Sequence, residues 1–439
     1  MVAGEKNGAN GIPKKIKFLF VSIESLSGDL AYQIKKEGHD VKVYIKAEED
    51  RDVYEGFLEK VDDWEKHKDW ADVIVFDDVG FGGTADRLRK EGRHVVGGST
   101  YTDKLELNRE FGQAEMKHFG VNVAESWNFT DFEAAIKFLK EKPGRYVMKP
   151  SGAAQDEKEL LFIGEEEDGK DLIEVLQHNK KSWARKIKTF QIQEFISAGV
   201  EVAAGAFFNG KDFIQPLNIN FEHKRLFPGD IGPFTGEMGT LMYWSQPNTI
   251  FNTTLAKMKD ALAQSGYVGY IDINCIANSR GIYPLEFTAR FGYPTISIQM
   301  EGILTPMGEF LYKLSRGENF ELKTKKGFQL GVVVVIPPFP FDDKKMVEVY
   351  KDSSILFKKP NMEGVHLGEV KLVEGDWKIA GVTGYALVIT GSGSTVDEAR
   401  KQAYKRVENI MLQNMFYRVD IGEKWFTDSD RLQTWGYLY

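Results

Sequence analysis

The sequence contains a single cysteine, Cys275, among its 439 residues. One cysteine excludes an internal disulfide framework and a zinc site built from several thiolates, so we expect a cytoplasmic protein in a reducing compartment. Positive charge is not in excess either, since 57 Lys and Arg stand against 65 Asp and Glu, a formal net charge of −8. Proteins that bind nucleic acid mainly through its phosphates carry clustered Lys and Arg, so nucleic acid is not expected as the main partner.

Long apolar runs are also missing. The longest candidate, residues 331–341, is interrupted by Pro337, Pro338 and Pro340, and a membrane-spanning helix needs about 18 uninterrupted apolar residues. We therefore expect no membrane partner. Residues 1–15 are rich in Gly, Asn and Lys and lack the apolar core of a signal peptide, which predicts a flexible tail.

Apolar runs of strand length alternate with helix-like segments in the first part of the chain. The runs occupy residues 16–22, 40–45, 71–76 and 94–96. Such alternation predicts right-handed crossovers and a doubly wound parallel sheet, which we assign to an N-terminal α/β domain over residues 16–115. No G-x-G-x-x-G follows the first run, so a dinucleotide-binding fingerprint is absent.

The rest of the chain predicts two further units of mixed α/β and α+β character. Residues 116–325 form a central domain, which includes a small α+β subdomain at about 122–197, and residues 326–439 form a small C-terminal α/β domain. Two S/T-x-x-E segments, one starting at Thr130 and one at Thr395, precede apolar residues at helical spacing. Each predicts a capping box at a helix start.

Acidic and polar residues alternate on two strand-like runs in the central domain. Asp272 and Asn274 share one face of the first run, and Glu286 and Arg290 share one face of the next. A turn at residues 279–281 predicts a hairpin that brings Asp272 close to Glu286. Facing carboxylates repel unless a cation lies between them, and hard oxygen ligands suit Mg²⁺, so the pair is a candidate metal site. The alternative is an exposed strand face with incidental charge.

Arg290 is placed to neutralise a transferring phosphoryl group. Lys149 ends an apolar strand, where burying an ammonium group is costly unless its charge is used. Glu194 and Glu201 flank a turn, which suits one acid near an adenine amine and the other at ribose hydroxyls. Lys149, Glu194 and Glu201 each have an ordinary alternative as solvated surface residues.

Basic residues followed by a glycine-rich loop form another candidate site. His223, Lys224 and Arg225 precede the Gly- and Thr-rich residues 229–239. Point charges beside closely approaching backbone N–H groups suit a substrate that carries a phosphate or a carboxylate. His223 taken alone is more often an ordinary surface histidine.

These segments together resemble the glycinamide ribonucleotide synthetase (phosphoribosylamine–glycine ligase) family of the ATP-grasp superfamily. The resemblance runs from about residue 16 to residue 422. Its motifs are HKR at 223–225, GPFTGEMG at 232–239, LEFTARFG at 285–292, GSGSTVDEAR at 391–400 and YRVDIG at 417–422.

The resemblance implies an ATP-grasp ligase whose cofactors are ATP and Mg²⁺ or Mn²⁺. The γ-phosphoryl group would pass to a carboxylate, and an amine would attack the resulting acyl phosphate to give an amide, ADP and phosphate. Glycine and phosphoribosylamine would be the small-molecule substrates, in purine biosynthesis. The protein would be a monomer or a small homo-oligomer.

The resemblance also implies roles for individual residues. ATP would be bound by Arg109, Lys149, Lys158, Glu194 and Glu201. The metal would be bound by Asp272, Glu286 and Thr288. Arg290, Lys224 and Arg225 would be catalytic. The substrates would be bound by His223, Thr235, Gly236, Met238 and Gly239.

The chain departs from the family pattern in several places. Thr288 stands where the family has Asn, and Arg109 where it has Lys. Acids replace the glycines of the family's flap, which contains Lys158 here, and other residues replace the turns at 22–29 and 78–84 that help to hold phosphoribosylamine. Three hypotheses therefore stay open: glycinamide ribonucleotide synthesis, a ligase of the same fold with a different, phosphorylated or nucleotide-like amine acceptor, and a non-catalytic nucleotide-binding descendant.

Overall fold

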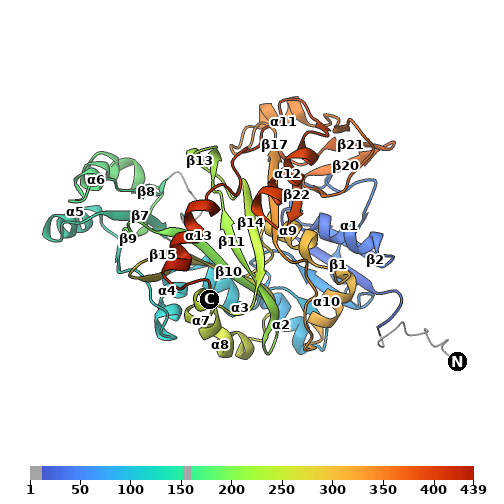
Figure 1. Cartoon of the computed structure of the whole chain (residues 1–439), viewed down its shortest axis with the longest axis horizontal. Helices are drawn as coiled ribbons and strands as arrows, with labels where there is room; N and C mark the ends of the chain where they lie inside the picture. Colours follow the sequence, from blue (N-terminus) through green and yellow to red (C-terminus); the bar gives the residue numbers. More distant parts are fainter. Residues whose placement is uncertain (1–11, 152–153, 155–159) are drawn as a thin grey trace.

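The first part of the chain folds around a five-stranded parallel sheet, as the alternating pattern predicts. The computed structural model describes residues 12–151, 154 and 160–439, and Figure 1 shows the whole chain. The strands have the order β3-β2-β1-β4-β5, and each neighbouring pair is parallel. Their bounds are β1 (Lys17–Ser22), β2 (Asp40–Ile45), β3 (Glu59–Lys60), β4 (Val73–Phe76) and β5 (Val95–Val96).

Helices α1 (Gly28–Lys36) and α2 (Gly82–Lys90) follow β1 and β4. All four residues of β4 are buried, as expected for a parallel sheet covered on both faces. β1 and β4 are neighbours at the centre of the sheet although β2 and β3 lie between them in the chain. The strand order therefore reverses direction between β1 and β4, and the loops that follow these two strands open on the same edge.

The small α+β subdomain is a four-stranded antiparallel sheet with two helices. The strand order is β6-β9-β7-β8, from β6 (Ser126–Phe129), β7 (Tyr146–Ser151), β8 (Phe162–Ile163) and β9 (Thr189–Glu194). The helices are α5 (Phe132–Glu141) and α6 (Lys170–Trp183). In Figure 1 this unit stands at one end of the molecule, beside the large sheet.

The capping box predicted at Thr130 is wrong. α5 begins one residue later, and Asp131 is its N-cap, with a carboxylate that accepts hydrogen bonds from the backbone N–H groups of Glu133 and Ala134. A carboxylate in that position satisfies two N–H groups of the first turn and suits the positive end of the helix dipole. The capping box at Thr395 is confirmed, because Thr395 and Glu398 cap each other's backbone N–H groups.

An eight-stranded sheet joins the predicted central and C-terminal domains. Its order is β16-β15-β10-β11-β14-β17-β22-β19. The bounds are β10 (Val200–Asn209), β11 (Phe213–Glu222), β14 (Gly239–Ser245), β15 (Val268–Asn278), β16 (Gly281–Thr288), β17 (Phe328–Val335), β19 (Val365–Leu367) and β22 (Tyr385–Gly393). β14 and β17 pair directly, with Leu241 opposite Leu330. Residues on both sides of position 326 thus share one sheet and one hydrophobic core.

The remaining helices surround these sheets. They are α3 (Thr100–Leu107), α4 (Arg109–His118), α7 (Thr249–Thr253), α8 (Lys259–Gln264), α9 (Thr295–Gly302), α10 (Met307–Ser315), α11 (Lys344–Tyr350), α12 (Val396–Val407) and α13 (Trp425–Thr434). Three short strand pairs complete the fold: β12 (Arg225–Phe227) with β13 (Ile231–Phe234), β18 (Leu356–Phe357) with β23 (Ile410–Met411), and β20 (Val370–Val373) with β21 (Asp376–Ile379). Within the described ranges, no helix is both long and apolar enough to cross a bilayer.

Candidate active site

The predicted hairpin is present and places the polar residues on one face of the large sheet. β15 and β16 are antiparallel and are joined by the two residues Ser279 and Arg280. The predicted closeness of Asp272 and Glu286 now has a register: Asn274 lies directly opposite Glu286, and Asp272 lies opposite Thr288. Directly opposed residues share a face, so Asp272 and Glu286 are diagonal neighbours on the same side of the sheet.

Buried oxygen atoms without hydrogen-bond partners collect at this hairpin. Among the described residues, Asp272 Oδ1, Asn274 Oδ1 and Glu237 Oε1 are buried and have no hydrogen-bond partner. Burial raises the pKa of Asp272 to about 8, and the neighbouring Glu222 adds to the shift while Arg290 opposes it. Oxygen atoms in this condition are costly, and a cation is what would compensate them.

These oxygen atoms fit a divalent metal ion for which the protein supplies only some of the ligands. In the part of the chain that the structure describes, no group of three or more His, Cys, Asp or Glu side chains is arranged to hold a metal ion. Mg²⁺ commonly takes one or two carboxylates and completes its shell with waters and substrate phosphates. Asp272 and Glu286, with the amide oxygen of Asn274 beside them, match that pattern. Thr288 lies on the same face, opposite Asp272.

Lys224 connects the acids around the hairpin. Its Nζ is 2.8 Å from Glu201 Oε1, 3.5 Å from Glu222 Oε2 and 3.8 Å from Glu286 Oε1. Burial opposes the positive charge, but the carboxylates of Glu201, Glu222 and Glu286 outweigh it and hold the pKa of Lys224 well above its ordinary value. The lysine is therefore a fixed positive charge at the centre of the candidate site.

Sequence reasoning assigned no role to Glu222 and Glu237, although both lie in segments that drew attention. Burial raises the pKa of each carboxyl, and each is also raised by neighbouring acids. For Glu222 a signal was available, because Leu217 to Glu222 alternates apolar and polar residues and places Asn218, Asn220 and Glu222 on one face of β11. Glu237 lies in a loop, where no periodicity marks the buried side.

Lys149 lies on β7 opposite Gln191 of β9 and is buried. Burial lowers its pKa to about 8, and the positive charges of Arg109 and Lys224 lower it further while Glu286 raises it. Arg109 begins α4, and its Nη1 donates to the carbonyl of Pro150 at 2.6 Å. Lys149, Arg109, Lys224 and Glu286 thus form one electrostatic neighbourhood, as expected for a site that receives a polyphosphate.

Replacing Lys149 with methionine should stabilise the free protein at pH 7 and weaken ATP binding by at least about tenfold, since a charge-assisted phosphate contact is worth about 1.5–3 kcal/mol. Because the pKa of Lys149 in the folded protein is about 8, below its value in the unfolded chain, its charge destabilises the folded protein. This destabilisation is complete below pH 8 and disappears as pH rises toward the pKa of lysine in the unfolded chain. The stability difference between the two proteins should therefore shrink from pH 8 to 10.5 in thermal melts. A constant difference would contradict this.

Three other residues were predicted to bind ATP, and their surroundings differ. Glu201 is bound to Lys224, as described above. Glu194 ends β9, where its carboxylate is 3.6 Å from Lys142 Nζ and is about half exposed. Lys158 lies outside the described residues. The nucleotide roles of all three stay predictions.

Arg290 joins the hairpin to the N-terminal sheet. Its Nε is 3.2 Å from Glu106 Oε1 and 3.5 Å from Asp78 Oδ1. Burial opposes its charge, but Glu106 and Asp78 raise the pKa of Arg290 above its ordinary value. Burial raises the pKa of Glu106 to about 7 although Arg290 opposes that shift. Glu106 and Asp78, which sequence reasoning did not single out, hold the guanidinium beside the loop that follows β4.

The HKR segment and the loop after it form a compact turn next to Lys224. Thr235 donates its backbone N–H to the Lys224 carbonyl at 2.8 Å, and Met238 donates to the His223 carbonyl at 2.8 Å. His223 donates its backbone N–H to the carbonyl of Gly239 at 3.0 Å. The backbone φ of Gly239 is +149°. Arg225 Nη1 donates to the Gly232 carbonyl at 2.7 Å. These contacts fix the backbone that presents Lys224.

The His223 ring is buried, and neither of its nitrogens has a hydrogen-bond partner among the described residues. Burial lowers its pKa to about 3, with the positive charges of Lys424 and Arg418 acting in the same direction. The ring is therefore neutral at physiological pH. Substrate contacts for His223, Thr235, Gly236, Met238 and Gly239, and catalysis by Arg225, stay predictions.

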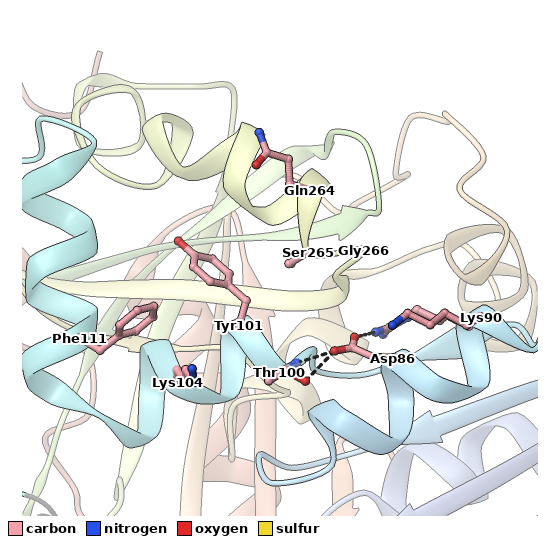
Figure 2. Close-up of a pocket in the computed structure, with 10 residues that line it drawn as sticks. Asp86, Lys90, Thr100, Tyr101, Lys104, Phe111, Gln264, Ser265 and Gly266 are labelled. Atoms are coloured by element: carbon pink, nitrogen blue, oxygen red, sulfur yellow. Dashed lines mark hydrogen bonds and ion pairs between the residues drawn. The ribbon is translucent and has the colours of Figure 1, made fainter.

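A separate hollow of about 550 Å³ lies beside α3 and α8 (Figure 2). The Asp86 carboxylate at its edge accepts hydrogen bonds from the Thr100 backbone and hydroxyl at 3.0 and 2.7 Å. Tyr101 and Phe111 line the same hollow and pack edge to face. None of the predicted site residues that the structure describes lines this hollow, so it is distinct from the candidate site.

Two family models match this chain. The model described as phosphoribosylglycinamide synthetase, ATP-grasp (A) domain matches residues 107–296, and the model for the C domain of the same enzyme matches residues 329–424. The chain belongs to the phosphoribosylglycinamide synthetase family. The first model contains the hairpin, Lys149, Lys224 and Arg290, so the candidate site lies in the ATP-grasp domain of this family member.

Curated relatives agree with the family assignment. The phosphoribosylamine–glycine ligase of Streptococcus pneumoniae is 27% identical over 380 residues, which cover 83% of this chain and 87% of the relative. The phosphoribosylamine–glycine ligase of Listeria innocua is 27% identical over 373 residues, which cover 82% of this chain and 86% of the relative. The similarity therefore spans most of both chains.

Solved structures support the fold. Phosphoribosylamine–glycine ligase from Thermotoga maritima superposes with a TM-score of 0.69 at 24% identity, covering 93% of this chain and all of the other. A biotin carboxylase from Campylobacter jejuni, described as a beta-gamma-ATP complex, gives a TM-score of 0.62 at 13% identity, covering 95% of this chain and 97% of the other. The architecture is that of the ATP-grasp enzymes, which confirms the predicted fold class.

Proposed function

We propose that this phosphoribosylglycinamide synthetase family member is an ATP-dependent ligase that joins glycine to phosphoribosylamine in purine biosynthesis. The names of its curated relatives describe that reaction. The observation that carries the proposal is the convergence of Lys149, Lys224 and Glu286 beside the unpartnered oxygens of Asp272 and Asn274. Positive charge and metal-ligating oxygen in one place are what phosphoryl transfer from ATP requires.

In this proposal the side chains of the protein position and neutralise the reactants. Lys149 and Lys224 bind phosphate oxygens of ATP, and Arg290 stabilises the phosphoryl group during transfer to the glycine carboxylate. Asp272 and Glu286 would hold Mg²⁺ or Mn²⁺, with Thr288 on the same face. When bound, that ion neutralises and orients phosphate oxygens. Glu222 and Glu201 fix Lys224, and Glu106 and Asp78 fix Arg290.

The test is release of ADP by purified protein given ATP, Mg²⁺, glycine and freshly prepared phosphoribosylamine. We expect ADP and the glycyl amide to form at equal rates, and omission of glycine or of the amine to stop both. ATP binding with no ADP from the complete mixture would favour the non-catalytic descendant instead. A cytoplasmic location and a monomeric or small homo-oligomeric state remain part of the proposal and are separate measurements.

A further inference from the structure

A buried tyrosine hydroxyl lies against the candidate metal site. Tyr270 and Asp272 are two residues apart on β15, so their side chains point to the same face of the sheet. The two side chains are hydrogen-bonded to each other. Tyr270 is 1% exposed and Asp272 is 2% exposed, so bulk water does not compete for this contact. The protein groups around Tyr270 therefore decide how its hydroxyl meets the carboxylate.

Two asparagine side chains of β11 donate to this hydroxyl. Asn218 Nδ2 lies 2.9 Å and Asn220 Nδ2 lies 3.4 Å from the Tyr270 oxygen, and both asparagines are fully buried. A tyrosine hydroxyl has one hydrogen to donate and accepts through the lone pairs of its oxygen. Because the two amides supply the accepted hydrogen bonds, the hydroxyl hydrogen is left to donate to Asp272.

The two amides are themselves held in this orientation. Asn218 Nδ2 also donates to Asn220 Oδ1 at 2.8 Å, and Asn218 Oδ1 accepts from Gln299 Nε2 of α9 at 3.2 Å. Reversing the Asn218 amide would place its oxygen against Asn220 Oδ1 and its nitrogen against the donor Gln299 Nε2. The network thus runs from α9 through β11 to β15, and β10 lies between these two strands in Figure 1.

A glycine of β10 leaves the space that the hydroxyl occupies. Gly205 lies directly opposite Asp272 on one side and Asn218 on the other. A Cβ atom at Gly205 would be 2.0 Å from the Tyr270 hydroxyl oxygen and 2.8 Å from Asp272 Cβ. Atoms that are not bonded do not approach so closely, so any larger residue would displace the hydroxyl. Glycine inside a strand often marks a close approach of this kind.

The carboxylate of Asp272 is held by the tyrosine and still has a free oxygen. Asp272 Oδ1 is buried and has no hydrogen-bond partner among the described residues. Carboxylates that bind metal ions are commonly hydrogen-bonded by neighbouring groups, which fix the direction in which the ligating oxygen points. A carboxylate that is fixed on one side and open on the other is suited to that role.

We propose that Tyr270 is a positioning residue for the metal site, whose hydroxyl donates to Asp272 and turns the free oxygen of that carboxylate toward a divalent ion. Tyr270 acts through Asp272 and is assigned no contact of its own with the ion or the substrates. The inference rests on the proposed function only in taking Asp272 as a metal ligand, and it does not depend on which amine is the acceptor. The alternative is a hydroxyl that only satisfies two buried asparagines, and its loss would then lower stability without changing metal binding.

Metal binding is tested first, by electron paramagnetic resonance of Mn²⁺ with the full-length protein and saturating ADP, without glycine or an amine. We expect Tyr270→Phe to weaken Mn²⁺ binding by about 10–100-fold, the usual effect of losing a hydrogen-bond partner of a metal ligand. Tyr404→Phe is the matched control, because the Tyr404 hydroxyl likewise accepts and donates, from the Ile421 N–H at 3.1 Å and to the Arg418 carbonyl at 2.9 Å. Equal Mn²⁺ affinity in the two variants would overturn the proposal, whatever their melting temperatures.

Gly205→Ala is a second variant, which keeps the tyrosine and fills the space of its hydroxyl. We expect weaker Mn²⁺ binding here too, and a double variant with Tyr270→Phe that binds Mn²⁺ no more weakly than Tyr270→Phe alone. Two changes that remove the same contact are not additive. Fully additive losses would show that Gly205 and Tyr270 act separately and would refute the proposed arrangement.

Turnover separates positioning from general damage. In Tyr270→Phe the Mg²⁺ concentration for half-maximal ADP release should rise by about the same 10–100-fold, and kcat should approach the wild-type value once Mg²⁺ is saturating. A loss of turnover that excess Mg²⁺ does not reverse would count against positioning. Binding of Mn²⁺ with ADP needs neither glycine nor phosphoribosylamine, so a failure of the proposed amide-forming reaction is seen separately. Wild-type protein that binds no Mn²⁺ with ADP would overturn this inference together with the metal site.

Discussion

Replacing Glu286 with alanine should reduce ATP turnover by at least about 10²–10³-fold, the usual cost of removing one group that stabilises transferred charge. Glu286 lies on the sheet face that carries the unpartnered oxygens of Asp272 and Asn274. Its side chain is 51% exposed, so the free energy of unfolding should change by less than about 1 kcal/mol. Lys224 keeps Glu201 and Glu222 as partners.

The measurements are ADP release and a thermal melt of the same preparation. Glu59→Ala is the matched control, because Glu59 is an exposed strand glutamate with a lysine partner, Lys42, at 3.2 Å, far in the chain from the hairpin. The control should retain full turnover. Wild-type turnover by Glu286→Ala would remove Glu286 from the metal site and leave the ATP-grasp fold without its proposed chemistry.

Lys224→Met should be the most damaging single change in stability. The substitution keeps the length of the side chain but leaves Glu201, Glu222 and Glu286 facing one another without their shared cation. Removing one partner of a buried ion pair costs about 3–5 kcal/mol. Of the three partners only Glu222 has a buried side chain, and the side chains of Glu201 and Glu286 are 36% and 51% exposed, so we expect the lower end of that range and a matching fall in ADP release. Lys259→Met is the control, since Lys259 is 43% exposed and pairs with Asp212 at the surface, where a pair is worth about 1 kcal/mol or less.

The pH dependence of this defect has a definite sign. Without Lys224, the carboxylates raise one another's pKa in the folded state, so the folded protein binds more protons than the unfolded chain and loses stability as pH rises. The stability deficit of Lys224→Met should therefore grow from pH 5 to pH 8. The double variant Lys224→Met/Glu222→Gln should recover part of the loss. A deficit that is equal at both pH values would show that the acids are not coupled through Lys224.

The turn at residues 22–29, which departs from the family pattern, is held by hydrogen bonds of its own in the folded chain. The backbone N–H groups of Leu26, Ser27 and Gly28 donate to Ser22 Oγ, Asp77 Oδ2 and the Tyr54 hydroxyl. The replacement of the family's residues has therefore left a turn with hydrogen bonds of its own at this position.

Local sequence determined much of this protein. Apolar runs of strand length fixed the parallel sheet, the 279–281 turn fixed the β15–β16 hairpin, and the motifs around Lys224 and Glu286 were enough for the family. These features depend on residues close together in the chain, where periodicity and turn chemistry decide the outcome.

Only the tertiary structure decided which charges meet. Glu201, Glu222 and Glu286 come from three different strands and share Lys224, and Asp78 and Glu106 reach Arg290 across more than 180 residues. The pairing of β14 with β17 likewise merges two predicted domains into one sheet. Such contacts follow from how whole sheets pack and close against one another, and the burial that shifts the pKa values of Lys149 and Asp272 exists only after that packing.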